Sequence, residues 1–145
     1  MRVVDVSLNA LNEVANDPEV LAAINPFADR IDLQWVYDKP GVMVKGCYGV
    51  RGCVLIIPWP DEVKEVHWFM PGNGGMEAIS TIVDWLFERT TTDCLFGNVP
   101  SANLAARFVN RWLGGKIVDE LTDAHGRPAV TFSLSREAWA SRKGG

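Results

Sequence analysis

The chain has 145 residues, of which 48% are hydrophobic and 22% charged, and its formal net charge at pH 7 is −4. This length and apolar content suffice for a hydrophobic core, and we predict one domain over residues 1–145. The acidic balance excludes the usual phosphate-tracking nucleic-acid binder. No apolar run approaches the roughly 18 residues of a membrane span, and the segment after Met1 and Arg2 is too short for a signal peptide. We therefore expect a cytoplasmic protein without a nucleic-acid or membrane partner.

The three cysteines, Cys47, Cys53 and Cys94, do not form a metal-binding or disulfide pattern. They are odd in number, lack the spacing of metal ligands and lie in apolar, strand-like surroundings. We interpret them as reduced core thiols and predict no metal site.

The N-terminal third begins with a short strand at residues 3–6 and continues into two helices. Ser7 is placed to cap the first helix, with Leu8, Leu11 and Val14 on one face. The second starts at 17–19, where Asp, Pro and Glu form an N-terminal signal, and it ends at Asn25 and Pro26.

The texture then changes to strands, separated by turns that contain proline or glycine. Four segments fit an antiparallel meander: 33–37, 41–50, 53–59 and 65–70. They are followed by a glycine-rich turn and by a helix whose apolar residues recur at helical spacing between Ile79 and Phe87.

The glycine-rich turn has two interpretations. Gly72, Asn73, Gly74 and Gly75 leave the backbone bare, so that several N–H groups can converge at the positive end of the helix dipole and bind an anion. Alternatively, the segment is a flexible connection between a strand and a helix.

The remaining elements are a strand at 94–100, a helix capped by Ser101, and a closing hairpin at 116–121 and 129–134. We expect the tail, 135–145, to be frayed. The strands before and after the long helix should be parallel neighbours, and their ends should splay over the glycine-rich turn. The fold class is therefore α/β (α+β), with a mixed central sheet flanked by helices.

This layout resembles the GCN5-related N-acetyltransferases (GNAT), including ribosomal-protein acetyltransferases and small phage-type members. The weaker match is the turn, where the family pattern of Gln or Arg, two residues, Gly, one residue, and Gly or Ala corresponds to Met70, Asn73 and Gly75. The stronger match is the segment from Gly97 to Gly115, with the family's Asn, two residues and Ala at Asn103 and Ala106. The resemblance covers roughly residues 40–134.

The resemblance implies acetyl-coenzyme A as cosubstrate. It implies that the backbone of the turn binds the pyrophosphate, and that Asn103 and Ala106 face the coenzyme at the start of their helix. Alternatively, Asn103 is part of an ordinary capped helix and Ala106 allows close packing. The chain departs from the family at Asn110, where a tyrosine often protonates the leaving thiolate, and at Gly115, where phenylalanine is usual.

Acetyl transfer to an amine requires a base and a polarised thioester carbonyl. A backbone N–H near Phe69 or Met70 could polarise the carbonyl. Glu65 and His67 are spaced by two and share one face of their strand, and His67 is the favoured base because imidazole titrates near neutral pH. Structural roles for both side chains remain the alternative.

Two functions are compatible with these features. The first is an N-acetyltransferase that transfers an acetyl group from acetyl-coenzyme A to an amine of unknown identity, and Trp35, Tyr37 or Trp59 could line its acceptor groove. The second is a catalytically inactive domain of the same fold, acting as a virion-associated or regulatory protein. A homodimer is compatible with either.

Overall fold

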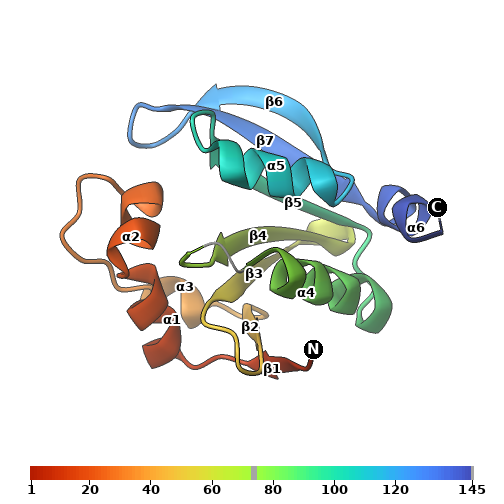
Figure 1. Cartoon of the computed structure of the whole chain (residues 1–145), viewed down its shortest axis with the longest axis horizontal. Helices are drawn as coiled ribbons and strands as arrows, with labels where there is room; N and C mark the ends of the chain where they lie inside the picture. Colours follow the sequence, from red (N-terminus) through yellow and green to blue (C-terminus); the bar gives the residue numbers. More distant parts are fainter. Residues whose placement is uncertain (73–74, 145) are drawn as a thin grey trace.

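A computed structural model describes residues 1–72 and 75–144, and within this part of the chain seven strands form one sheet (Figure 1). The strands are β1 (Val3–Asp5), β2 (Met43–Cys47), β3 (Cys53–Trp59), β4 (Val63–Phe69), β5 (Cys94–Pro100), β6 (Lys116–Thr122) and β7 (Pro128–Ser135). The helices are α1 (Leu8–Ala15), α2 (Pro18–Ile24), α3 (Gln34–Tyr37), α4 (Gly75–Arg89), α5 (Leu104–Trp112) and α6 (Arg136–Gly144), with a 3-10 turn η1 (Pro60–Glu62).

The strand order in the sheet is β1-β2-β3-β4-β5-β7-β6. Strands β1 to β4 are antiparallel, β4 and β5 are parallel, and β5, β7 and β6 are again antiparallel. This pairing agrees with the pattern of strands and turns in the sequence, which predicts an antiparallel meander, a parallel pair around α4 and a closing hairpin.

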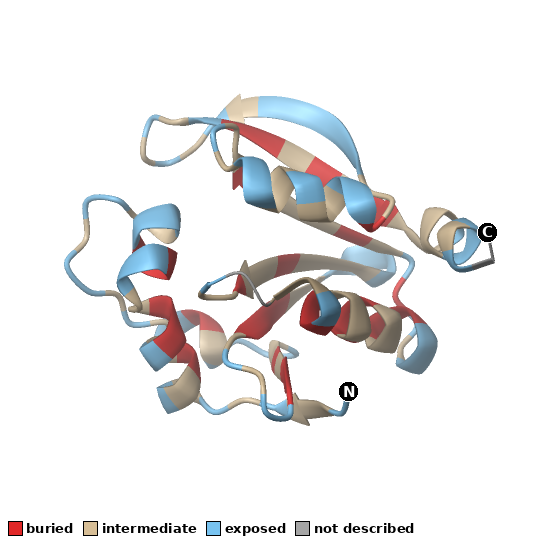
Figure 2. Cartoon of the chain, viewed as in Figure 1, coloured by how far each residue is buried: buried red, intermediate tan, exposed pale blue. Residues whose placement is uncertain are grey.

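The described core has three clusters, and two of them lie on opposite faces of the sheet because residues of β3 alternate between these faces. Val54 and Ile56 pack with Ile82 and Leu86 of α4 on one face. Leu55 packs on the other face, within a cluster that includes residues of α1, α2 and α3. Figure 2 shows these buried positions along the inner side of α4 and in the strands beneath it. The sheet therefore carries helices on both faces.

The strand predicted at 33–37 is wrong, because Gln34–Tyr37 form the short helix α3 and Leu33 is its N-cap. The side chain of Asp32 accepts a hydrogen bond from the Gln34 N–H, and the Tyr37 N–H donates to the Leu33 carbonyl. These local bonds start a helical turn, and Val36 is buried against the α1 and α2 layer. A segment of five residues is too short for its pattern to distinguish a strand from a helix. The Asp32 side chain, which bonds the backbone two residues later, favours the start of a helical turn.

The C-terminal segment is helix α6 rather than the frayed tail expected from the sequence. The Ser135 hydroxyl accepts a hydrogen bond from the Ala138 N–H, as a helix N-cap does. Trp139 stacks on Phe87 of α4 with ring centroids 5.1 Å apart, and its indole N–H donates to Asp84. Docking on α4 therefore orders the tail.

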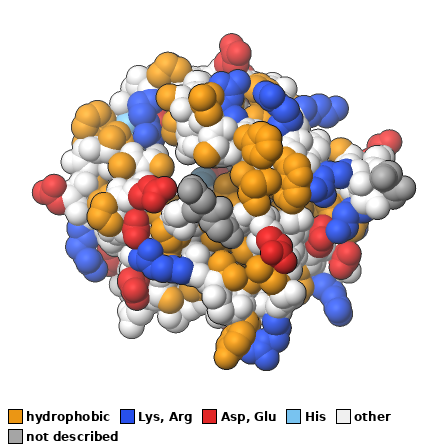
Figure 3. Space-filling model, in the orientation of Figure 1, with side chains coloured by type: hydrophobic (Ala, Val, Ile, Leu, Met, Phe, Trp, Pro, Cys, Tyr) orange, Lys and Arg blue, Asp and Glu red, His pale blue; other side chains and the backbone are white. Residues whose placement is uncertain are grey.

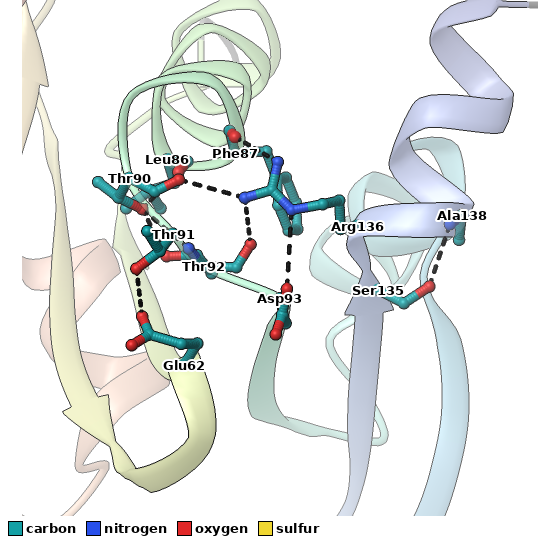
Figure 4. A network of polar contacts seen from close by, with 10 residues as sticks. All are labelled: Glu62, Leu86, Phe87, Thr90, Thr91, Thr92, Asp93, Ser135, Arg136 and Ala138. Carbon is teal, nitrogen blue, oxygen red and sulfur yellow. Dashed lines mark hydrogen bonds and ion pairs between the residues drawn. The ribbon is translucent and has the colours of Figure 1, made fainter.

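Arg136 joins α6 to the end of α4 (Figure 4). Its guanidinium donates to the carbonyl oxygens of Phe87, Thr90 and Thr92 at 2.6, 3.2 and 2.6 Å. Its backbone N–H donates to the Asp93 carbonyl, immediately before β5. Carbonyls at a helix C-terminus lack partners within the helix, so Arg136 satisfies them and fixes where β5 begins.

Candidate active site

Strands β4 and β5 are paired at their beginnings and then separate. Their pairing consists of three register pairs: Val63↔Cys94, Lys64↔Leu95 and Glu65↔Phe96. Farther along, β4 stays paired with β3 as far as Phe69, and β5 stays paired with β7 as far as Pro100. Each strand is thus held by its outer neighbour while a gap opens between the two, as the sequence predicts.

Gly97 lies where the strands diverge. A Cβ atom built there would lie 2.8 Å from the carbonyl oxygen of Val66, which is closer than any side chain tolerates. A glycine is therefore required for the two backbones to come this near before they separate.

Two cavities adjoin at this gap. The turn-side cavity, of about 580 Å³, is lined by Met70, Gly72 and Gly75 together with the start of α5. The sheet-side cavity, of about 560 Å³, is lined by Glu65, His67 and the ends of β4 and β5. Ala23, Ile24, Trp68, Asn103 and Ala106 line both. Both volumes are within the range of small-molecule sites, and Figure 3 shows a hollow near the centre of this face.

The glycine-rich turn is described at Met70, Gly72 and Gly75, whereas Asn73 and Gly74 lie outside the described residues. Gly72 has φ +76°, and a Cβ there would meet open space. Gly75 begins α4, and a Cβ at this position would lie 2.8 Å from Cβ of Met70. The absence of a side chain at Gly75 is thus what lets the turn pack closely against the end of β4.

A carboxylate already contacts this turn. The backbone N–H of Gly72 donates to Oε2 of Glu19, on α2, at 3.3 Å. No local motif indicates this contact, because 53 residues separate the partners. A backbone N–H of the turn, three residues before the start of α4, therefore donates to a negatively charged group, as the N–H groups of an anion site do.

The start of α5 is capped by Asn103, and the prediction that Ser101 caps it is wrong. Oδ1 of Asn103 accepts a hydrogen bond from the Ala106 N–H at 3.1 Å. Ser101 instead bonds through its backbone to Pro128 and Arg107. Asn103 thus has the structural role of a cap, and Asn103 and Ala106 also face both cavities.

Glu65 and His67 form a hydrogen-bonded pair on β4, as their spacing predicts. Nε2 of His67 lies 2.6 Å from Oε2 of Glu65, and the indole N–H of Trp59 donates to Oε1 of Glu65 at 3.0 Å. The hydrogen bond from His67 lowers the pKa of Glu65, against an opposing effect of burial. An ionised carboxylate only accepts hydrogen bonds, so Nε2 is the donor and Nδ1 is left to take up a proton.

The other predicted residues occupy different parts of this region. Phe69 is buried beneath α1 and α3 and lines the sheet-side cavity. Asn110 lines the same cavity, and its side-chain amide donates to the Ala106 carbonyl at 2.8 Å. Trp35 also lines this cavity. Trp59 is not among the residues that line it, and it contacts the site through its hydrogen bond to Glu65.

Sequence reasoning missed the closure of the sheet-side cavity by the β6–β7 turn. Nη2 of Arg127 donates to the carbonyl of Ala23, at the end of α2, at 3.1 Å. The rings of Phe27 and His125 meet edge to face, with centroids 6.1 Å apart. The partners in the first contact are 104 residues apart, so no local motif could have indicated it.

In the described residues, no group of three or more His, Cys, Asp or Glu side chains is arranged to hold a metal ion. Over the same residues, no helix combines the length and apolar character needed to cross a membrane.

Comparison with known proteins gives matches in structure but not in sequence. No protein-family model matches the chain. No curated protein matches it. An aminoglycoside acetyltransferase in complex with coenzyme A and kanamycin is 17% identical, with a TM-score of 0.74 over 97% of this chain and 98% of the other. A spermidine N-acetyltransferase from Vibrio cholerae, in complex with coenzyme A and spermine, is 12% identical, with a TM-score of 0.75 over 96% and 97%.

A ribosomal-protein-alanine N-acetyltransferase from Brucella melitensis is 19% identical, with a TM-score of 0.71 over 93% of this chain and 99% of the other. A GNAT-family acetyltransferase from Bacillus anthracis is 15% identical, with a TM-score of 0.69 over 93% of this chain and 94% of the other. The chain therefore has the fold of the GNAT acetyltransferases, and the predicted fold class is confirmed.

Proposed function

We propose that the protein is an N-acetyltransferase that moves an acetyl group from acetyl-coenzyme A to an amine. The observation that carries this proposal is the pair of adjoining cavities at the splayed ends of β4 and β5. One cavity begins at a helix N-terminus suited to phosphates, and the other contains a histidine held by a carboxylate. The solved structures of this fold that contain coenzyme A with kanamycin or spermine support such a division.

The described part of the turn is compatible with a coenzyme. Gly72 and Gly75 present no side chain toward the turn-side cavity, and the N–H of Gly72 already binds a carboxylate oxygen. Asn103 and Ala106 line the passage from this cavity to the acceptor side. Met70 offers no charge to the pyrophosphate, so the phosphates would depend on backbone N–H groups and the dipole of α4.

In the reaction, the amine nitrogen attacks the thioester carbonyl carbon, the N–C bond forms and the C–S bond breaks. The sulfur leaves with the electron pair as a thiolate. Nδ1 of His67 takes the proton of the amine, directly or through water, and Glu65 stabilises the resulting imidazolium. Asn110 has no acidic proton, so the thiolate takes its proton from solvent. A backbone N–H near Phe69 or Met70 would polarise the carbonyl.

The test has two stages. Thermal unfolding with acetyl-coenzyme A at about 100 times its dissociation constant should show about 2.7 kcal/mol of stabilisation. Release of coenzyme thiol with a panel of amines should then depend on the amine. Absence of coenzyme binding would refute the proposal, whereas binding without transfer to any amine would favour a catalytically inactive domain of this fold.

A further inference from the structure

We propose that the acceptor is a small primary amine with one positive charge and an apolar, ring-containing body. This inference rests on the proposed function and names the substrate class of the sheet-side cavity. Three features of that cavity support it: the distribution of carboxylates, the nature of the walls and the closure above it.

The carboxylates of the sheet-side cavity are not equivalent. Among the described residues that line it, the acidic side chains are Glu65 and Asp123. Asp123 is engaged by its own turn: Oδ2 pairs with Nε of Arg127 at 2.9 Å, and Oδ1 accepts the backbone N–H groups of His125 and Arg127. These hydrogen bonds lower its pKa, so it is ionised and its charge is compensated by Arg127.

Among the described residues, Glu65 is hydrogen-bonded to no such permanent cation: its partner His67 is charged only after taking up a proton, and Lys39 acts on it through its charge alone. Each oxygen of Glu65 accepts one hydrogen bond, from His67 or from Trp59, and a carboxylate can accept about four. The cavity therefore offers one place for an ammonium group, next to the proposed base.

The wall beside the base is apolar. It is formed by Leu33, Trp35 and Val36, at and after the start of α3, and by Leu55 and Ile57 of β3, which are the register partners of His67 and Glu65. A second ammonium group placed against this wall would find no further uncompensated carboxylate among the described residues that line the cavity. Polyamines and aminoglycosides carry such additional charges. A ring or short aliphatic body would instead replace water along the wall at a gain in free energy.

Contacts between the end of α2 and the β6–β7 turn form a bridge across the sheet-side cavity. The Arg127 bond to the Ala23 carbonyl and the contact between Phe27 and His125 join the end of α2 to the β6–β7 turn. A volume of about 560 Å³ beneath this bridge accommodates a small molecule. A protein N-terminus would have to pass under the bridge or break it, so a small amine is the favoured acceptor.

The experiment compares acceptors with acetyl-coenzyme A and the full chain. The panel contains 2-phenylethylamine and tryptamine, spermidine and kanamycin, and a peptide with a free N-terminal alanine. We expect kcat/KM for the aromatic monoamines to exceed that for each other acceptor by at least about 100-fold. A preference for spermidine, kanamycin or the peptide would overturn the inference.

A variant tests the apolar wall separately. Trp35→Glu adds a carboxylate at an exposed position of the wall, where 67% of the residue is accessible, and it should raise the ratio of spermidine to phenylethylamine kcat/KM by about 10-fold. Tyr48→Glu makes the same change of charge at a residue that is 72% exposed and does not line the cavity, and it should leave the ratio unchanged. Equal effects of the two variants would refute the assignment of the wall.

A binding measurement separates failure of this inference from failure of the proposed function. If acetyl-coenzyme A binds but no amine is acetylated, the proposed function fails. Thermal shifts with the same amines then still test the acceptor class: stabilisation by phenylethylamine but not by spermidine would support it, and the reverse would overturn it.

Discussion

Replacing Glu19 with glutamine should strengthen the binding of acetyl-coenzyme A. The Glu19 carboxylate accepts a hydrogen bond from the Gly72 N–H at 3.3 Å, at the turn where a phosphate would have to lie. Two like charges 4 Å apart repel by about 1 kcal/mol in bulk water, which corresponds to a factor of about 5 in affinity. A second phosphate nearby increases this effect, so we expect the dissociation constant to fall about 5- to 10-fold. Glutamine keeps the shape and an acceptor oxygen, so the turn itself should not change.

The assay is titration of acetyl-coenzyme A by calorimetry at 50 mM and 500 mM salt. The gain from Glu19→Gln should shrink at high salt, because the contact is exposed and screening shortens the range of its field. Glu13→Gln is a matched control: Glu13 is exposed on α1, and the substitution changes the formal net charge by the same amount. Unchanged affinity in Glu19→Gln, or an equal gain in Glu13→Gln, would refute electrostatic competition at the turn. Weaker binding would mean that the carboxylate instead holds the turn in its binding conformation.

Four further predictions concern other residues. Asn110→Tyr supplies an acid where the thiolate must otherwise rely on solvent, and it should raise kcat, by up to roughly 100-fold if the phenol reaches the sulfur; an unchanged solvent isotope effect and rate would contradict this. Gly75→Val places a side chain where a Cβ is already too close to the end of β4, and calorimetry should show loss of coenzyme binding while circular dichroism shows a folded protein. Arg136→Ala removes three hydrogen bonds to carbonyls in the last turn of α4 and just after it, and it should lower the free energy of unfolding in urea by about 2 to 3 kcal/mol, whereas Arg136→Lys should recover part of this loss. His67→Ala removes the proposed base and should lower kcat for acetyl transfer while calorimetry shows unchanged coenzyme binding; an unchanged kcat would contradict the assignment.

Much of the fold follows from local patterns. The alternation of Val54, Leu55 and Ile56 and the helical spacing from Ile79 to Phe87 reflect burial on one face, which is what periodicity reports. The misassigned elements are short or terminal. Residues 33–37 are too few for periodicity to decide, and α6 is stabilised by its docking on α4 through Trp139 and by the bonds of Arg136, which no local pattern contains.

The candidate site is less predictable, because side chains far apart in the sequence complete it. The adjacency of Glu65 and His67 follows from strand geometry, and their hydrogen bond agrees with it. Two side chains near the start of α5 could serve as its cap, and the sequence favoured Ser101 although Asn103 is the cap. The contacts of Glu19 with Gly72 and of Arg127 with Ala23 depend on where α2 lies over the sheet, and that position is fixed by tertiary packing.

The pairing of Glu65 and His67 also has a consequence for stability that is independent of catalysis. The folded-state pKa of Glu65 is lowered, first by the hydrogen bond from His67, so the ionised carboxylate is stabilised by folding. Such a group contributes stability that is present above its unfolded-state pKa, near 4.5, and that is lost as the pH falls through its lower folded-state value. The difference in unfolding free energy between the native chain and Glu65→Gln, measured with urea from pH 7 to pH 3, should therefore be constant above about pH 5.5 and decline below about pH 4.5. Glu88→Gln, which makes the same change of charge at an exposed position of α4, is the matched control. A difference that grows as the pH falls would show that Glu65 is protonated more readily in the folded state, and His67 would then lack the carboxylate that the proposed mechanism gives it.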